Sequence, residues 1–328
     1  MSSRKGRRRT GPAANDGRPA PAADADDVRA ADRPRGLFGG ALFGSGPSPL
    51  PPLGRSLGRG LLAVASQPAL VGLAIALVVA AWIGLIMLGF EGSPGRMVDL
   101  LAMPPISTYF DLGTGASVFG FGSSFLVFTG LALLLRAIIT SLLTGMILES
   151  LEAGRVTLAG AILGLRAFPT ALAVAVLSFS LIVAGNIVFP ILGPGIGFLG
   201  FVAALVAGLF FLGFAPAAAI REGRGVTESL RRSGRAAMLP GGRHLLLCTL
   251  YFFLALPVVV GFAPGGGEIT ANPSLVTWVF VLGVNVLHVA FMAAFAYRWV
   301  IAEPNVPEQP VPRRRQAARA SAGARGRR

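Results

Sequence analysis

The apolar part of this chain contains few side chains that could do chemistry. The two histidines are His244, at the edge of an apolar run, and His288, inside another. Asn285 lies three residues before His288, so the two share one face of a helix. Asn186, in a third apolar run, could pair with them across a helix bundle. These residues fit either hydrogen bonds between helices, worth about 1 kcal/mol each, or a site for a substrate or a lipid headgroup.

Arg136 is a further candidate, because it divides an apolar stretch that runs from about Ser117 to Leu148. As a helix this stretch would be about 47 Å long, which exceeds one membrane crossing. If the span ends at Arg136, the guanidinium lies at the inner interface and the helix continues into the cytosol. If the span is centred on Arg136, the buried charge costs at least ~2.5 kcal/mol and would mark a functional site. We favour the interfacial placement.

Motifs of common enzyme chemistry do not assemble with confidence from this sequence. It contains no HExxH motif, no clustered metal ligands, and no clear serine, histidine and aspartate set. Gly195, Gly197 and Gly200 spell GxGxxG, but the run follows no strand and opens an apolar helix, so it is not a dinucleotide motif. None of the 15 carboxylates lies inside a predicted span, which disfavours a carboxylate proton relay. We therefore expect a protein that is not an enzyme and has no cofactor and no metal.

The composition predicts an all-α polytopic membrane helix bundle. Of the 328 residues, 53% are apolar and only 13% are charged, a combination atypical of soluble domains. Gly193, Pro194 and Gly195 separate two runs that are each long enough to cross a hydrocarbon core of about 30 Å, so these runs should form a helical hairpin. In all, six transmembrane helices are expected, at about 68–90, 117–136, 170–192, 196–219, 244–263 and 275–299.

Three regions follow from the same patterns. Residues 1–52 and 301–328 are Pro-rich and basic and should be disordered tails, flanking a membrane domain at 53–300. At the start of that domain, apolar residues at helical spacing predict a short amphipathic helix on the membrane surface: Leu53, Leu57, Leu61 and Val64. In the first span, small residues recur at every fourth position and predict a helix-packing face: Gly72, Ala76, Ala80 and Gly84.

Two loops that flank the hairpin resemble each other. At an offset of 70 residues, five positions are identical, including the pairs Glu152 with Glu222 and Thr157 with Thr227. In each loop the threonine could cap a short helix at the inner interface. The second of these helices carries three arginines on one side: Arg231, Arg232 and Arg235.

The basic residues predict the orientation. With six spans and both termini in the cytosol, all but two of the 29 basic residues fall inside; the exceptions are Arg96, outside, and Arg136. The positive-inside rule favours this topology and a location in the bacterial cell membrane. The net charge of +14 then points to anionic lipid headgroups at the tails and loops as partners, with no nucleic acid. A protein partner or a homo-oligomer stays open.

The second loop and the span end before it read AAAIREGRGVTESLRRSGRAAM. This run, and LEAGRVTLAGAILG in the first loop, resemble bacterial six-span proteins related to the membrane domain attached to some glycerophosphodiester phosphodiesterases. The resemblance covers about residues 55–300 and implies their membrane fold. It implies no catalytic residue, since the soluble phosphodiesterase domain has no counterpart here.

These observations favour a noncatalytic multi-pass membrane protein, acting in envelope lipid handling or as a scaffold. One alternative is a transporter or permease subunit that works with a cytosolic ATPase, because LESLEAGRVTLAG is similar to a coupling loop. The other is an intramembrane enzyme that uses His288 or Arg136.

The topology predicts the accessibility of single introduced cysteines in intact cells. Cysteines at Gly113 and Gly266 should react with a membrane-impermeant thiol reagent, because both positions lie in outer loops. Cysteines at Gly225 and Ser321 should not react until the membrane is opened. Labelling at Gly225 in intact cells would contradict the orientation.

Overall fold

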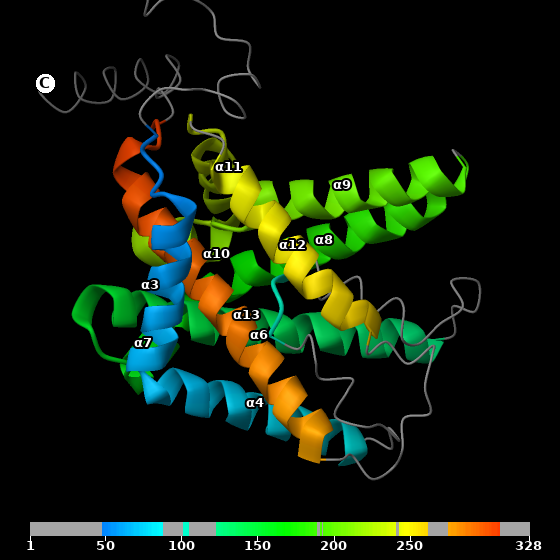
Figure 1. Cartoon of the computed structure of the whole chain (residues 1–328), viewed down its shortest axis with the longest axis horizontal. Coiled ribbons are helices and arrows are strands. Elements are labelled where there is room, and N and C mark those ends of the chain that lie inside the picture. Colours follow the sequence, from blue (N-terminus) through cyan, green and yellow to red (C-terminus); the bar gives the residue numbers. More distant parts are fainter. Residues whose placement is uncertain are drawn as a thin grey trace, which may run out of the picture. The chain divides into compact units, whose positions relative to one another are not determined.

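The computed structural model describes residues 48–87, 101–104, 123–188, 191, 193–240, 243–261 and 275–308. Within these ranges the regular structure is entirely helical (Figure 1). The helices are α3 (Leu53–Ser66), α4 (Pro68–Met87), α6 (Ser123–Ala153), α7 (Leu158–Gly164), α8 (Phe168–Val188), α9 (Pro194–Leu212), α10 (Ala215–Glu222), α11 (Val226–Ala237), α12 (Arg243–Gly261) and α13 (Leu275–Ala302). The all-α class expected from the sequence is confirmed.

Four helical segments among the described residues are long and apolar enough to cross a membrane: Leu133–Ala153, Leu158–Gly185, Gly195–Glu222 and Trp278–Asn305. A fifth is added if α3 and α4, which meet at an angle of 82°, form one broken span. Arg243–Leu254 in α12 is a shorter apolar segment. The described residues thus support a membrane protein with four or five candidate spans, where the sequence predicted six.

The hairpin around Gly193 forms as expected. α8 and α9 lie side by side in Figure 1 and are joined through the turn before Pro194. Gly193 has a φ of 92°, a conformation that side chains disfavour, and it is the N-terminal cap of α9. The first N–H of a helix has no partner within the helix, so Pro194, which has no N–H, begins α9 without the loss of a hydrogen bond.

The α9 helix ends at Leu212 because the chain cannot continue its hydrogen-bond ladder. Pro216 has no N–H to donate to the Leu212 carbonyl. Ser233 of α11 bonds to the backbone on the α9 side of the break, since its hydroxyl donates to the Phe211 carbonyl at 2.6 Å and accepts from the Phe214 N–H at 3.2 Å. The span predicted at 196–219 is therefore a broken helix that α11 supports.

The contact between α6 and α7 depends on glycine. A Cβ atom on Gly145 would lie 2.6 Å from the Cα atom of Gly164, closer than any real contact. Thr157 caps α7 as predicted, accepting a hydrogen bond from the Gly160 N–H at 3.3 Å. However, α7 continues through the 3-10 turn Leu165–Ala167 into α8, and the candidate span begins at Leu158. This first loop helix is thus part of a candidate span, and its location at the inner interface stays a prediction.

The α3 helix forms where an amphipathic helix was predicted, and its buried face overlaps the predicted stripe in part. It packs along α13 (Figure 1) through Ser56, Gly60, Ala63 and Val64. Of the stripe, Val64 is buried and Leu53 and Leu57 are half-buried against the core, whereas Leu61 is 54% exposed. The two helix backbones approach closely at Gly60, where a Cβ atom would lie only 3.0 Å from the Ala294 nitrogen.

The small-residue face predicted for α4 is not a packing face of this chain. The side of α4 that carries Gly72 and Ala76 is exposed, as are Ala80 and Gly84, and nothing lies within 4 Å of a Cβ atom built on Gly72. Leu70, Ala74 and Val78 are buried instead. Near its end, α4 contacts α13 through a T-shaped ring pair of Trp82 and Trp278, whose centroids are 5.0 Å apart.

The packed part extends beyond the boundaries predicted at 53 and 300. Leu50 is 1% exposed, and the Pro51 carbonyl accepts a hydrogen bond from Arg298 at 3.0 Å. At the other end Val306 is 5% exposed, after the 3-10 turn Glu303–Asn305. Of the tails expected at 1–52 and 301–328, residues 1–47 and 309–328 lie outside the described residues.

The close contact of Gly145 with the α7 backbone predicts that two Gly-to-Ala variants differ in stability. Gly145→Ala should lower stability by about 1–3 kcal/mol, because the added methyl overlaps the α7 backbone. Gly72→Ala is the matched control and should lose nothing, since its methyl has open space. Thermal unfolding of the purified protein in detergent measures both. Equal melting temperatures for the two variants would contradict the close crossing.

Candidate functional site

Three polar side chains meet inside the bundle between α12 and α13. Tyr251, Asn285 and His288 are each no more than 2% exposed. The Tyr251 Oη atom lies 3.0 Å from His288 Nδ1 and accepts a hydrogen bond from the Met103 N–H at 2.9 Å. The Asn285 Oδ1 atom accepts a hydrogen bond from the Leu101 N–H at 3.0 Å. The cluster thus bonds two backbone amides of a distant segment, Leu101–Pro104, whose residues are all buried.

The hydrogen bond between Tyr251 and His288 has two possible directions, which the histidine tautomer decides. When Tyr251 donates to His288 Nδ1, the histidine is neutral and carries its proton at Nε2. Asn285 in turn donates from Nδ2 to the Val281 carbonyl at 2.8 Å, which holds its amide in one orientation. The chemistry of the cluster is therefore suited to holding a non-helical segment inside apolar surroundings.

The structure brings together some of the predicted site residues. Asn285 and His288 lie in one cluster, as their spacing indicated. The side chain of Asn186 lies outside the described side chains. Tyr251 and the segment Leu101–Pro104 were not predicted; a tyrosine within the apolar run LLLCTLYFFLAL was the available signal.

Arg136 lies within one continuous helix. α6 runs unbroken from Ser123 to Ala153, and a candidate span within it begins at Leu133. The placement of Arg136 at the inner interface of the membrane stays a prediction. Its side chain is 8% exposed, so it is buried against other parts of the protein.

A second pair of polar residues is buried where α3, α9, α12 and α13 approach. Arg298 is fully buried, and its Nη1 atom donates to the Pro51 carbonyl and to the Ser56 hydroxyl, both at 3.0 Å. His244 Nε2 lies 3.1 Å from the Phe210 carbonyl, and its ring stacks on Phe214 with centroids 4.2 Å apart. Both residues connect helices that are distant in sequence.

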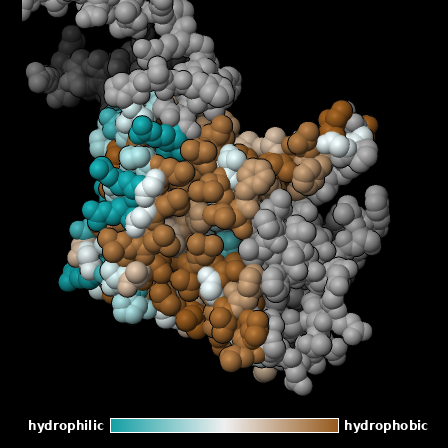
Figure 2. All heavy atoms as spheres, in the orientation of Figure 1, coloured by the Kyte–Doolittle hydropathy of each residue, from teal (hydrophilic) through white to brown (hydrophobic). Residues whose placement is uncertain are grey.

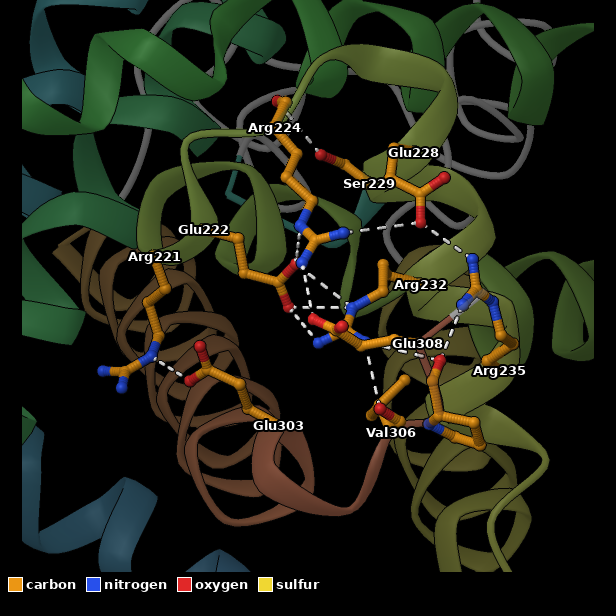
Figure 3. A network of polar contacts seen from close by, with 11 residues as sticks. Arg221, Glu222, Arg224, Glu228, Ser229, Arg232, Arg235, Glu303, Val306 and Glu308 are labelled. Atoms are coloured by element: carbon orange, nitrogen blue, oxygen red, sulfur yellow. Dashed lines mark hydrogen bonds and ion pairs between the residues drawn. The ribbon is translucent and has the colours of Figure 1, made fainter. Parts of the chain in front are cut away.

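Figure 3 shows a network of charged residues around α10 and α11. Its most buried members are Glu222 and Arg232, with side chains 7% and 5% exposed. Two guanidinium nitrogens of Arg232 bond to the Glu222 carboxylate at 2.7–3.1 Å, and the third donates to the Val306 carbonyl at 3.0 Å. All three nitrogens of this arginine thus have partners, which a buried charge requires.

Further ion pairs extend the network to other segments. Arg221 pairs with Glu152 at the end of α6 and with Glu303 after α13, the latter at 2.5 Å. Arg235 bonds to Glu228 at 2.8 Å and to the Pro307 carbonyl at 2.6 Å. Four parts of the chain, namely the end of α6, α10, α11 and residues 303–308, are therefore held together by charge.

The basic helix predicted from Arg231, Arg232 and Arg235 needs correction. Arg231 is exposed, but Arg232 is buried and points to Glu222, because α11 packs against α10 and the residues after α13. The predicted cap at Thr227 is also wrong: α11 begins at Val226 with Gly225 as its cap, so Thr227 lies inside the helix.

Comparison with known proteins adds no name to these sites. No protein-family model, no curated protein and no solved structure matches the chain.

The buried ion pair predicts that substitution of two adjacent arginines lowers stability by different amounts. Arg232→Leu should destabilise the protein by about 1–3 kcal/mol, because the buried Glu222 carboxylate then keeps only the partly exposed Arg224, at 2.5 Å, as its partner. Arg231→Leu, at an exposed position, should change stability little. Combining Arg232→Leu with Glu222→Leu should recover part of the loss. Thermal unfolding in detergent measures all three, and similar losses at 231 and 232 would contradict the assignment.

Proposed function

We propose that this chain is a multi-pass integral protein of the bacterial cell membrane, where it acts as a noncatalytic, lipid-associated component or scaffold. Its charged and polar residues build the fold, and its apolar helix faces contact lipid.

The outer faces of several helices support the membrane location. Large apolar side chains are more than half exposed on α9 and α13: Ile196, Phe198, Leu199, Leu275, Val276 and Val279. Figure 2 shows hydrophobic residues covering much of one face, with hydrophilic residues gathered toward the side where α3 begins. In water such a surface would drive association, whereas in a bilayer acyl chains cover it.

The role of the carboxylates supports a structural and noncatalytic function, and this is the observation that carries the proposal. Glu149 accepts hydrogen bonds from the N–H and hydroxyl of Thr157 at 2.8–2.9 Å. Glu222, Glu228 and Glu303 each bond to arginines of α10 or α11. Glu149, Glu222 and Glu303 connect separate segments and Glu228 bonds within α11, which accounts for their positions without a reaction.

The resemblance to membrane domains attached to glycerophosphodiester phosphodiesterases agrees with this proposal. The matching run includes Arg221, Glu222 and Arg232, which form the charged network in this chain. In the proposed orientation that network faces the cytosol, where a scaffold could present it to other proteins.

The proposal predicts the behaviour of the tagged protein in membrane fractions. It should stay in the membrane pellet after alkaline carbonate extraction and copurify with phospholipid in mild detergent. Release by carbonate would contradict an integral protein. Stoichiometric copurification of an ATPase would contradict the scaffold role and favour a permease subunit. Carbonate extraction thus tests the membrane location, and copurification tests the role.

A further inference from the structure

The segment that follows α13 lies against the arginines of α10 and α11. Residues 303–308, called the strap below, begin with the 3-10 turn Glu303–Asn305. Within the strap only the side chain of Val306 is buried and belongs to the apolar core, whereas Pro307 and Glu308 are exposed. One apolar side chain and a set of polar contacts therefore hold the strap on the surface of the helices.

Three oxygen atoms of the strap face three guanidinium groups (Figure 3). Arg232 Nη1 donates to the Val306 carbonyl at 3.0 Å, and Arg235 Nη1 donates to the next carbonyl along the chain at 2.6 Å. The Glu308 carboxylate lies 3.5 Å from Arg224 Nη2, and its side chain is 81% exposed. Two of these acceptors are uncharged and the third is open to solvent, so water and salt compete with the contacts.

The strap also balances the charge of the network. The ion pairs around α10 and α11 involve four arginines and five glutamates: Arg221, Arg224, Arg232 and Arg235, with Glu152, Glu222, Glu228, Glu303 and Glu308. Glu303 and Glu308 belong to the strap. Without it, four arginines would face three glutamates, next to the exposed Arg231. Displacement of the strap would thus leave a net positive surface.

A phosphate group is the ligand that such a surface fits. It presents three strong acceptor oxygens and carries a charge of about −1.5 to −2 as a monoester. Guanidinium groups match phosphate in geometry, and hydrogen bonds between charged partners are roughly twice as strong as neutral ones. In exchange for the strap, the arginines would gain charged acceptors in place of two uncharged carbonyl groups and one exposed carboxylate.

We propose that Arg224, Arg232 and Arg235 form a binding site for a phosphate group, which the strap occupies in this structure. Binding of phosphate displaces the strap, and return of the strap closes the site. The phosphate belongs either to a soluble molecule or to a lipid headgroup. The lipid source rests on the proposed membrane location, whereas the site itself does not.

Cysteine labelling of the full-length protein in detergent tests the displacement. The native Cys248 is fully buried, so an introduced cysteine dominates the signal. Replacement of chloride by inorganic phosphate at constant ionic strength should speed labelling of Val306→Cys about tenfold, the factor expected for one charge-assisted hydrogen bond. Ala302→Cys, buried in the last turn of α13, is the matched control and should not change. Equal rates in the two salts, or a rise at both positions, would overturn the proposal.

Two arginine variants in the Val306→Cys background provide the second arm. Arg235→Gln should speed labelling without phosphate, because the strap loses a contact, and should raise the half-maximal phosphate concentration about tenfold. Arg231→Gln, at an exposed position, should change neither quantity. An unaltered phosphate response in Arg235→Gln would overturn the site. If Val306→Cys does not fold, hydrogen–deuterium exchange of residues 303–308 in the protein without an introduced cysteine measures the same displacement.

Nanodiscs distinguish the two sources of phosphate. Val306→Cys is labelled in phosphatidylcholine nanodiscs with and without phosphatidic acid, and separately with added inorganic phosphate. Faster labelling with phosphatidic acid supports the site and assigns it to a lipid headgroup, whereas faster labelling with soluble phosphate alone supports the site and assigns it to a soluble molecule. No change with either would overturn the site, while carbonate extraction would still decide the membrane location.

Discussion

Backbone polar groups buried in an apolar bundle must be hydrogen-bonded, and this constraint determines how the polar residues of the protein are used. A helix satisfies its own backbone, but each interruption leaves N–H and C=O groups that water cannot reach in a membrane. At the α9–α10 break the Ser233 hydroxyl bonds to both Phe211 and Phe214. At Leu101–Pro104, Asn285 and Tyr251 accept the backbone amides. At these two places buried polar side chains lie where the chain departs from helical structure, whereas Ser141 and Thr144 donate to carbonyls of their own helix.

The interruption between α9 and α10 has the same origin. Pro216 has no N–H to donate to the Leu212 carbonyl, so the helical hydrogen bonds stop there. Within the break, Gly213 lets α13 approach closely, since a Cβ atom on it would lie 2.9 Å from the Phe295 ring.

Charge holds a different part of the molecule together. The end of α6, α10, α11 and residues 303–308 are joined by ion pairs in addition to buried apolar contacts (Figure 3). Most of these pairs are partly exposed, and exposed pairs stabilise a protein only slightly. Arg232 differs because it is buried, so it specifies one position of α11 against α10 and Val306.

The sequence by itself determined the helical class, the membrane character and the hairpin at Gly193, since these depend on local composition and on turn residues. It also indicated that Asn285 and His288 share a face, and that Thr157 caps a helix. The tertiary structure decided which faces are buried. On α4 the small-residue stripe did not identify the packed side, and on α3 the hydrophobic stripe identified it only in part, because in a largely apolar chain almost every face can be buried. Close contacts of individual glycines, such as Gly60 with α13 and Gly145 with α7, select among them. The partners of Arg232, Tyr251 and Asn285 are likewise distant in sequence or at irregular positions, so local patterns carried no information about them.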